Sequence, residues 1–189
     1  NCNVVYSSNN LSDITGRQEH SMIAIGTDIY IFGGDGGYNY SGANLNDLYK
    51  IDTINCNVEE ITITGPTITG RSAHSMVAIG TDIYIYGGNN TDNGFLNDFY
   101  KIDTINCNVV YSNLNLSNID DTISARSTHS MVAIGTDIYI YGGYGGSSIG
   151  RLNDFYKIYE KTNKTYEKVE DSYYSNIFTE ESPYYTEIT

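Results

Sequence analysis

A repeat of about 55 residues constrains the fold of this 189-residue chain more than any other feature. The run from His74 to Gly88 returns letter for letter at positions 129–143, and the run at positions 20–34 differs only at Ile23 and Phe32. An arginine precedes each run at positions 17, 71 and 126, which gives periods of 54 and 55 residues. A repeat of this length is typical of one supersecondary unit that stacks on its neighbours, such as a propeller blade.

Each repeat predicts four short strands. In the first repeat we expect them at residues 21–25, 29–32, 45–52 and 58–63, where apolar, β-branched and aromatic residues recur. A tight Gly-Thr-Asp turn separates the first two strands in all three repeats. Four antiparallel strands make one propeller blade. The pattern therefore predicts an all-β fold, a partial β-propeller of three four-stranded antiparallel blades plus a stray N-terminal strand.

The ordered motifs of the repeat resemble the Kelch family. They are the arginine and histidine before the first strand, the Ile-Tyr-Ile-Phe/Tyr-Gly-Gly run of the second, and the Leu-Asn-Asp-x-Tyr run of the third. The resemblance covers roughly residues 1–170 and implies a Kelch-type β-propeller. In Kelch domains that bind acidic peptide segments, arginines at similar positions contact the ligand carboxylates, which implies this role for Arg17, Arg71 and Arg126.

The same arginines also have a structural interpretation. A residue present in every repeat is favoured to hold the repeat together, for example by a hydrogen bond to a loop carbonyl oxygen. Converging on one face, the three arginines would instead form a positive ring that attracts an acidic peptide. His20, His74 and His129 are expected to be packing or hydrogen-bonding residues and not metal ligands.

The loops after the double glycines are the candidate binding surface. They span residues 35–44, 89–95 and 144–151 and differ in every repeat, whereas the Gly-Thr-Asp turns do not. Tyrosine beside glycine, serine and asparagine is typical of adaptable protein-binding loops. The alternative is that these are solvent loops without a role. The candidate partner-binding residues in these loops are Tyr38, Tyr40, Asn89, Asp92, Tyr144 and Arg151.

The chain contains three repeats and part of another. We expect blades at residues 13–66, 67–118 and 119–170. Residues 1–12 copy the fourth strand of a blade, and residues 171–189 form an acidic, tyrosine-rich tail. Propellers typically close with four to eight blades. Either the chain is a segment of a larger propeller, which we favour, or it forms a homodimer that closes a six-bladed ring.

Charge and hydropathy argue against two classes of partner. Ten Lys and Arg against 23 Asp and Glu give a net charge of −13, which repels nucleic acid and anionic membrane surfaces. No apolar stretch approaches the roughly 18 to 20 residues of a membrane-spanning helix. We therefore expect neither a nucleic acid nor a membrane as a partner.

The three cysteines bear on the cellular location. Cys2, Cys56 and Cys107 occupy equivalent positions in successive repeats, too far apart to pair, so we expect free thiols. Free thiols favour an intracellular setting, whereas four Asn-x-Ser/Thr sequons favour the opposite. The location therefore stays open, with an intracellular setting slightly favoured by the unpaired cysteines.

Sequence motifs of catalysis and metal binding are missing. There is no nucleophile elbow, phosphate-binding loop, zinc-type spacing of His and Cys, or Asp-x-Asp-x-Asp-Gly calcium loop. Residues 89–94 resemble a cation loop but lack its terminal bidentate glutamate, so calcium is not expected. The sequence predicts a non-catalytic protein–protein interaction module without metal or cofactor. The alternatives are a carbohydrate-binding or enzymatic propeller, or a structural component of a large assembly.

Overall fold

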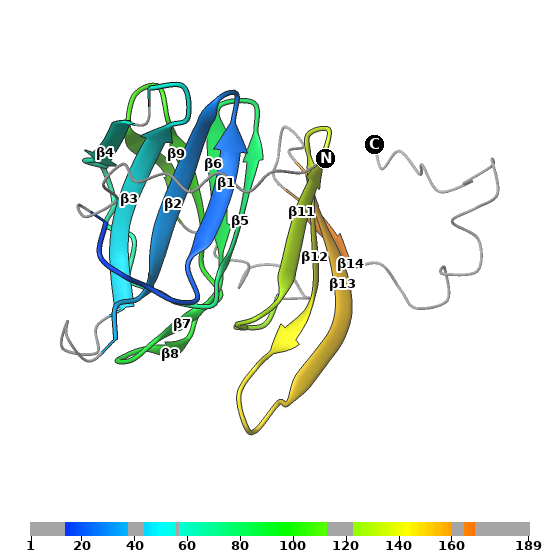
Figure 1. The fold of residues 1–189 in the computed structure, drawn as a ribbon. Helices are drawn as coiled ribbons and strands as arrows, with labels where there is room; N and C mark the ends of the chain where they lie inside the picture. Colours follow the sequence, from blue (N-terminus) through cyan, green and yellow to red (C-terminus); the bar gives the residue numbers. More distant parts are fainter. Residues whose placement is uncertain (1–13, 38–43, 56, 113–122, 160–164, 169–189) are drawn as a thin grey trace, which may run out of the picture.

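The computed structural model describes residues 14–37, 44–55, 57–112, 123–159 and 165–168, and the regular elements in these ranges are all β-strands (Figure 1). They form three four-stranded antiparallel sheets, called here blades 1, 2 and 3, and one short hairpin. Blade 1 consists of β1 (Ser21–Ile25), β2 (Asp28–Asp35), β3 (Asn44–Asp52) and β4 (Asn57–Ile61). Blade 2 consists of β5 (Ser75–Ile79), β6 (Asp82–Tyr86), β9 (Phe99–Asp103) and β10 (Asn108–Ser112). Blade 3 consists of β11 (Ser130–Ile134), β12 (Asp137–Tyr144), β13 (Arg151–Tyr159) and β14 (Thr165–Lys168).

The strand order of each sheet follows the order of the chain, so each blade is an up-and-down meander. The hairpin consists of β7 (Asn89–Asn90) and β8 (Gly94–Phe95) and lies between β6 and β9. The expected all-β architecture of three four-stranded blades is confirmed. The expected stray strand at residues 1–12 and the tail at residues 171–189 lie outside the described residues.

The same turn connects the first two strands of every blade. Glycine at positions 26, 80 and 135 has φ between +61° and +63°, a left-handed conformation that glycine adopts at little cost. After the turn of blade 2, a carboxylate oxygen of Asp82 lies 2.8 Å from the Nζ atom of Lys101 on the third strand. Blades 1 and 3 have the equivalent ion pair. The turn and the ion pair therefore support the same register between the second and third strands in all three blades.

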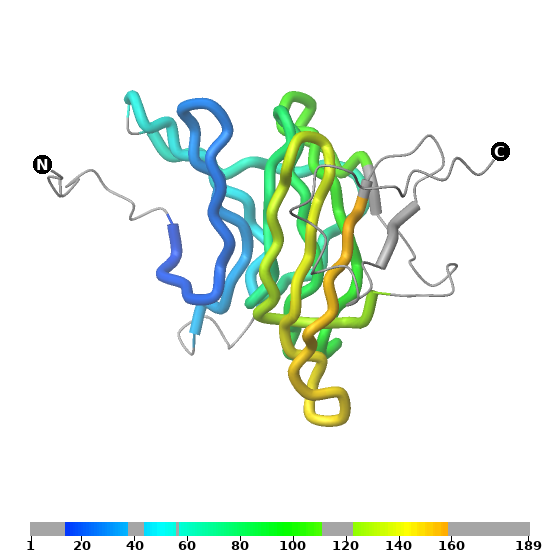
Figure 2. Tube along the Cα trace, turned by 90° about the vertical axis from the view of Figure 1, so that its right-hand side faces the viewer, coloured from blue at the N-terminus to red at the C-terminus, as the bar shows by residue number. Residues whose placement is uncertain are grey.

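The blades stack face to face through apolar side chains. Their first strands, β1, β5 and β11, lie side by side (Figures 1 and 2). Successive residues of a strand point to opposite faces of a sheet. In β6, Ile83 and Ile85 therefore pack toward blade 1, while Tyr84 and Tyr86 pack toward blade 3. None of these four side chains is more than 8% exposed, so blade 2 is covered on both faces.

Two of the repeated histidines belong to these interfaces. The ring of His74 meets Phe32 edge to face with 5.5 Å between centroids, and the ring of His129 meets Tyr86 in the same way at 5.3 Å. Burial, with a smaller contribution from nearby arginines, lowers the pKa of His74 to about 3 and that of His129 to about 4. Both rings are therefore neutral packing residues, as expected. His20 is exposed, because no described blade covers that side of blade 1.

Candidate functional site

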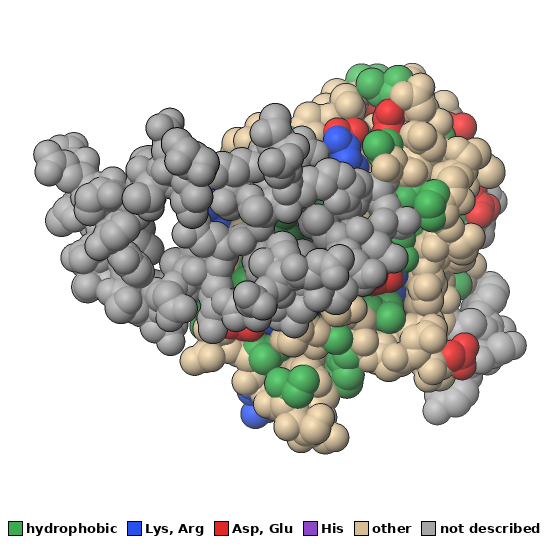
Figure 3. Space-filling view, turned by 180° about the vertical axis from the view of Figure 1, so that it is seen from behind, with side chains coloured by type: hydrophobic (Ala, Val, Ile, Leu, Met, Phe, Trp, Pro, Cys, Tyr) green, Lys and Arg blue, Asp and Glu red, His purple; other side chains and the backbone are tan. Residues whose placement is uncertain are grey.

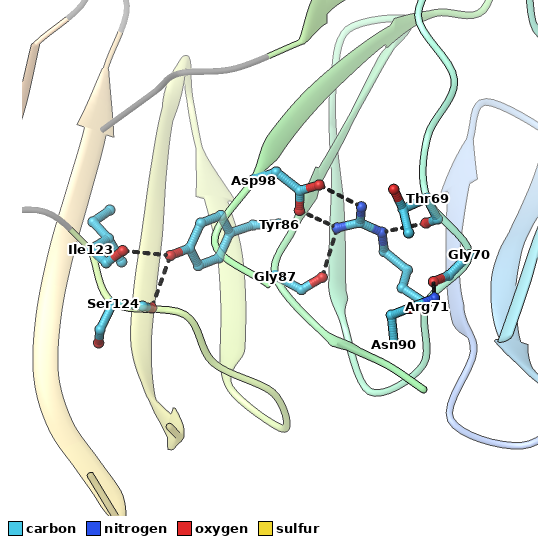
Figure 4. A network of polar contacts seen from close by, with 9 residues as sticks. All are labelled: Thr69, Gly70, Arg71, Tyr86, Gly87, Asn90, Asp98, Ile123 and Ser124. Carbon is cyan, nitrogen blue, oxygen red and sulfur yellow. Dashed lines mark hydrogen bonds and ion pairs between the residues drawn. The ribbon is translucent and has the colours of Figure 1, made fainter. Parts of the chain in front are cut away.

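The repeated arginines lie at the end of the blades from which the variable loops emerge. The side chain of Arg71 is fully buried, and its Nη1 and Nη2 atoms donate to the two carboxylate oxygens of Asp98 at 2.6 and 2.8 Å (Figure 4). Its Nε atom donates to the carbonyl oxygen of Thr69 at 3.1 Å, and Nη1 also donates to that of Gly87 at 2.8 Å. The guanidinium group lies 5.1 Å from the ring centroid of Tyr100, whose pKa burial and Asp98 raise to about 12.

The other two repeats have the same ion pair. Arg126 donates to both carboxylate oxygens of Asp154 at 2.6 and 2.8 Å, and Arg17 donates to Asp47 at the same two distances. Burial alone lowers the pKa of Arg126, but the hydrogen bond and charge of Asp154 raise it above its ordinary value. The same pair lowers the pKa of Asp154 although burial acts in the opposite direction. Both partners are therefore charged at neutral pH.

In this geometry each repeated arginine, expected to contact an acidic partner, is paired with an aspartate of its own chain. Their side chains are at most 4% exposed, and aspartates of the same chain already occupy the guanidinium groups. A ligand would have to break a buried ion pair, which is costly. The backbone of Arg71 is also occupied, since its N–H donates to Leu45 and its carbonyl oxygen accepts from Gly34 of blade 1. The structural interpretation of these arginines agrees with the observed contacts.

The variable loops contact one another and form one surface, which we call the loop face (residues 35–37, 44, 89–95 and 144–151). Between blades 1 and 2, the Oδ1 atom of Asn44 accepts hydrogen bonds from the backbone N–H and the hydroxyl of Thr91 at 2.7 and 2.9 Å. Between blades 2 and 3, the rings of Phe95 and Tyr144 meet edge to face with 5.6 Å between centroids. Each of the three loops thereby contacts the loop of a neighbouring blade.

The loop of blade 2 contains the hairpin β7–β8, which the sequence analysis missed. Asn90 organises it: its Nδ2 atom donates to the carbonyl oxygen of Gly70 at 2.6 Å (Figure 4), and its Oδ1 atom accepts from the backbone N–H groups of Asp92 and Asn93 at 3.0 Å. The Asn-Thr-Asp-Asn-Gly sequence was a turn signal that could have revealed it. The segment that resembles a cation loop is therefore a turn. Within the described ranges, no cluster of three or more His, Cys, Asp or Glu could hold a metal ion.

The structure brings four of the six predicted loop residues onto the loop face. Tyr38 and Tyr40 lie outside the described residues. The other four differ in exposure: Asp92 and Arg151 are exposed, Tyr144 is 37% exposed, and Asn89 is half-buried.

One exposed apolar residue of the loop face was not selected from the sequence. Ile149 is 55% exposed in the connection between β12 and β13, which projects below the rest of the molecule in Figures 1 and 2. From behind, apolar side chains gather at this lower end beside a basic one (Figure 3). Together with the exposed Tyr144 at the end of β12, Ile149 makes this projecting tip a candidate contact surface for a partner.

Two further expectations concern cysteine and the membrane. Cys107 is a free thiol, as expected, whereas Cys2 and Cys56 lie outside the described residues. In the part of the chain that the structure describes, no helix has the length and apolarity to cross a membrane.

Comparison with protein families decides the assignment. Residues 19–177 match the model of the KLHDC2/KLHL20/DRC7 Kelch-repeats domain. The chain belongs to the Kelch-repeat family. Among solved structures, YjhT superposes on this Kelch-repeat chain with a TM-score of 0.66 at 15% sequence identity, covering 82% of this chain and 52% of the other. That likeness concerns the fold.

Curated proteins related to this Kelch-repeat chain are much longer. Human Kelch domain-containing protein 3 is 27% identical over 161 residues, which are 82% of this chain and 41% of that protein. Tip elongation aberrant protein 1 of Schizosaccharomyces pombe is 28% identical over 146 residues, 77% of this chain and 12% of that protein. N-(sulfonatooxy)prop-2-enimidothioate sulfolyase of Thlaspi arvense is 33% identical over 141 residues, which are 72% of this chain and 37% of that protein. The chain spans less than half of each relative, and one of them is named as an enzyme.

Proposed function

We propose that this Kelch-repeat chain is a non-catalytic protein–protein interaction module that binds its partner through the loop face. The observation that carries the proposal is the mutual contact of the loops, through Asn44 with Thr91 and through Phe95 with Tyr144. Loops of unlike sequence are thus held as one preformed surface on a rigid scaffold. A preformed surface loses less conformational entropy on binding than free loops would.

The projecting end of blade 3 supplies the main contacts. Tyr144, Ile149 and Arg151 are exposed there, and tyrosine and arginine are the residue types enriched where binding energy concentrates. A partner segment that presents an apolar or aromatic side chain fits this surface. Among the described residues of the loop face, Arg151 is the one basic side chain, so it would be the contact for an acidic peptide.

Peptide selection followed by affinity measurement tests the proposal. Peptides that bind the 189-residue chain are selected from a random display library, and their Kd values are measured by fluorescence anisotropy. Ile149→Ser and Tyr144→Ala should each weaken binding about tenfold or more, as expected when a contact of high energetic weight is lost. Arg151→Ala should also weaken the binding of selected acidic peptides, whereas the affinity for neutral peptides should not change.

Matched controls lie at the opposite end of the blades. Ile54 and Ile105 are 71% and 73% exposed in the β3–β4 and β9–β10 turns. Ile54→Ser and Ile105→Ser remove the same apolar side chain and should leave Kd unchanged. Selected peptides that depend on Ile54 or Ile105 and tolerate the loop-face variants would overturn the assignment of the loop face.

A further inference from the structure

Blade 3 has an open pocket on the face that points away from blade 2, toward the viewer in Figure 2. Its volume is about 830 Å³, and Tyr141 contributes to its lining. Tyr141 is 51% exposed, whereas the residues at the same position of the other repeats, Phe32 and Tyr86, are fully buried. Similarly, Val132 is 52% exposed and its equivalent Val77 is 8% exposed. This face therefore has the side chains of an interface between blades, but no other described segment covers it.

Blades 1 and 2 show what covers the same position. On blade 2 it is the segment of blade 3 that runs from Arg126 to His129. The N–H of Gly88 donates to the carbonyl oxygen of Arg126 at 2.8 Å, and the N–H of Arg126 donates to the carbonyl oxygen of Leu96 at 3.1 Å. Residues 71–74 make the same pair of backbone bonds to blade 1. The occupant is thus an Arg-x-x-His segment from the start of the next blade.

Blade 3 keeps the backbone groups that receive such a segment. Gly143 pairs with Leu152 in the same register in which Gly34 pairs with Leu45 in blade 1, so the corresponding N–H and carbonyl groups are directed at the pocket. Ser130 also lines the pocket and is exposed. The equivalent serines of blades 1 and 2 donate to the carbonyl oxygen of the next histidine at 2.8 and 2.7 Å.

Among the described residues, the space above the first glycine of the double glycine is open in blade 3 and filled in blades 1 and 2. A Cβ atom built on Gly87 would meet the carbonyl oxygen of Arg126 at 2.7 Å and the Cε1 atom of His129 at 3.0 Å. A Cβ atom on Gly142, the equivalent residue, would meet nothing within 4 Å among the described residues except the carbonyl oxygen of Leu152. The missing neighbours are the arginine carbonyl and the histidine ring of a following segment.

A matching segment lies at the other end of the same chain. Residues 17–20 read Arg-Gln-Glu-His, and Glu19 has φ of +55°, close to the +52° and +54° of the equivalent residues in the other repeats. The conformation required for docking is therefore already present. His20 is exposed, and Met22 is 58% exposed where its equivalent Met76 is 7% exposed.

We propose that two copies of this chain pair head to tail and close a six-bladed ring, with residues 17–20 of each copy docked in the blade 3 pocket of the other. Each contact stacks His20 on Tyr141 and covers Met22 and Val132. It repeats the interface that already joins blade 1 to blade 2 and blade 2 to blade 3. At the level of the fold, three blades cover 52% of the YjhT chain, which leaves room there for about as many again. Tyr144 and Arg151 of the loop face also line this pocket, whereas Ile149 does not, so Ile149 separates this proposal from the proposed function.

Light scattering coupled to size exclusion tests the assembly on the 189-residue chain. We expect a mass of twice 21.0 kDa. The dimer fraction should rise between roughly 0.15 M and 1 M salt, because two copies with a net charge of −13 each repel one another and salt screens that repulsion. A folded chain that stays monomeric at its highest soluble concentration would overturn the proposal. Larger, open-ended assemblies would contradict closure of the ring.

Variants on the two faces identify the contact. Tyr141→Glu and His20→Glu each place a charge in both contacts of the dimer and should abolish it, while both chains stay folded because these side chains are exposed. Ile54→Glu is the matched control, an exposed apolar residue outside the contact that should leave the dimer intact.

Mixing the two variants tests the head-to-tail geometry. Residues 17–20 of the Tyr141→Glu chain can still dock on the His20→Glu chain, so the mixture should form a weaker dimer through one contact. A dimer that tolerates both variants, or a mixture that stays monomeric, would refute this geometry. Ile149→Ser on the loop face should leave the mass unchanged, so failure of the ring and failure of the proposed function are distinguishable.

Discussion

Replacing Arg71 with alanine should destabilise the chain by about 3 kcal/mol. The change removes the bidentate pair with Asp98 at 2.6 and 2.8 Å and the hydrogen bonds to Thr69 and Gly87. Removing one partner of a buried ion pair typically costs about 3 to 5 kcal/mol, because the other charge stays buried without compensation. The side chain of Asp98 keeps 18% exposure, so water can partly solvate it, and we expect the lower end of that range.

Urea unfolding followed by circular dichroism measures this loss, and thermal unfolding should show the midpoint lowered by about 6 to 12 °C. Lys101→Ala is the control, because the pair of Lys101 with Asp82 is 21% and 27% exposed and should contribute less than about 1 kcal/mol. The double variant Arg71→Met with Asp98→Leu should recover most of the loss, since no buried charge stays uncompensated. If Arg71→Ala lowered the free energy of unfolding by no more than Lys101→Ala does, the reasoning would be refuted. Unchanged stability with lost peptide binding would make Arg71 a binding residue.

Three further substitutions, with Gly80→Ala as a control, test the packing between blades. Burial lowers the pKa of His129 to about 4 from an ordinary 6.5, so the unfolded chain binds more protons and stability falls as the pH drops from about 6.5 toward 4. His129→Phe should reduce the slope of this part of the pH profile of the urea midpoint, while His74, whose pKa is lowered to about 3, keeps the remainder; an unchanged slope would contradict the prediction. Gly88→Ala should cost more than about 2 kcal/mol, because φ is +101° and the new Cβ would lie 2.8 Å from the carbonyl oxygen of Ser72. Gly80→Ala, at φ +61° in open space, should cost about 1 kcal/mol in the same urea assay, and equal losses would speak against the close approach. Tyr86→Phe removes a hydroxyl that donates to two backbone carbonyls and should lower the urea-derived stability by about 1 kcal/mol, whereas no change would show that these bonds contribute nothing.

The strands could be predicted from the sequence because their signals are local. Alternating apolar residues and the Gly-Thr-Asp turn specify the first two strands of every blade within one or two residues, apart from the double glycine that β2 and β12 include. The hairpin β7–β8 was missed because its two-residue strands are too short to show a period. It depends on the side chain of Asn90, which bonds to the carbonyl oxygen of Gly70 across the loop.

The candidate site was harder to predict because its contacts are distant in the sequence. The repeated arginine left two interpretations open, since its aspartate partner lies 27 to 30 residues further along the chain. The sequence did contain a signal for this pairing. The aspartate of the Leu-Asn-Asp motif recurs once in each repeat, as the arginine does. The contact of Phe95 with Tyr144 had no such signal, because both residues lie in loops whose sequences differ from repeat to repeat.

The sequence by itself determined the four-stranded blade and the presence of three such blades. The backbone conformation of a blade follows from short-range patterns, and these patterns are repeated three times. Only the tertiary structure decided which copy of a repeated side chain is buried. Phe32, Tyr86 and Tyr141 occupy one position of the repeat, yet the first two are fully buried and the third is 51% exposed. The difference arises because a blade buries its apolar faces only against other blades, so burial depends on a neighbour that the repeat itself does not contain.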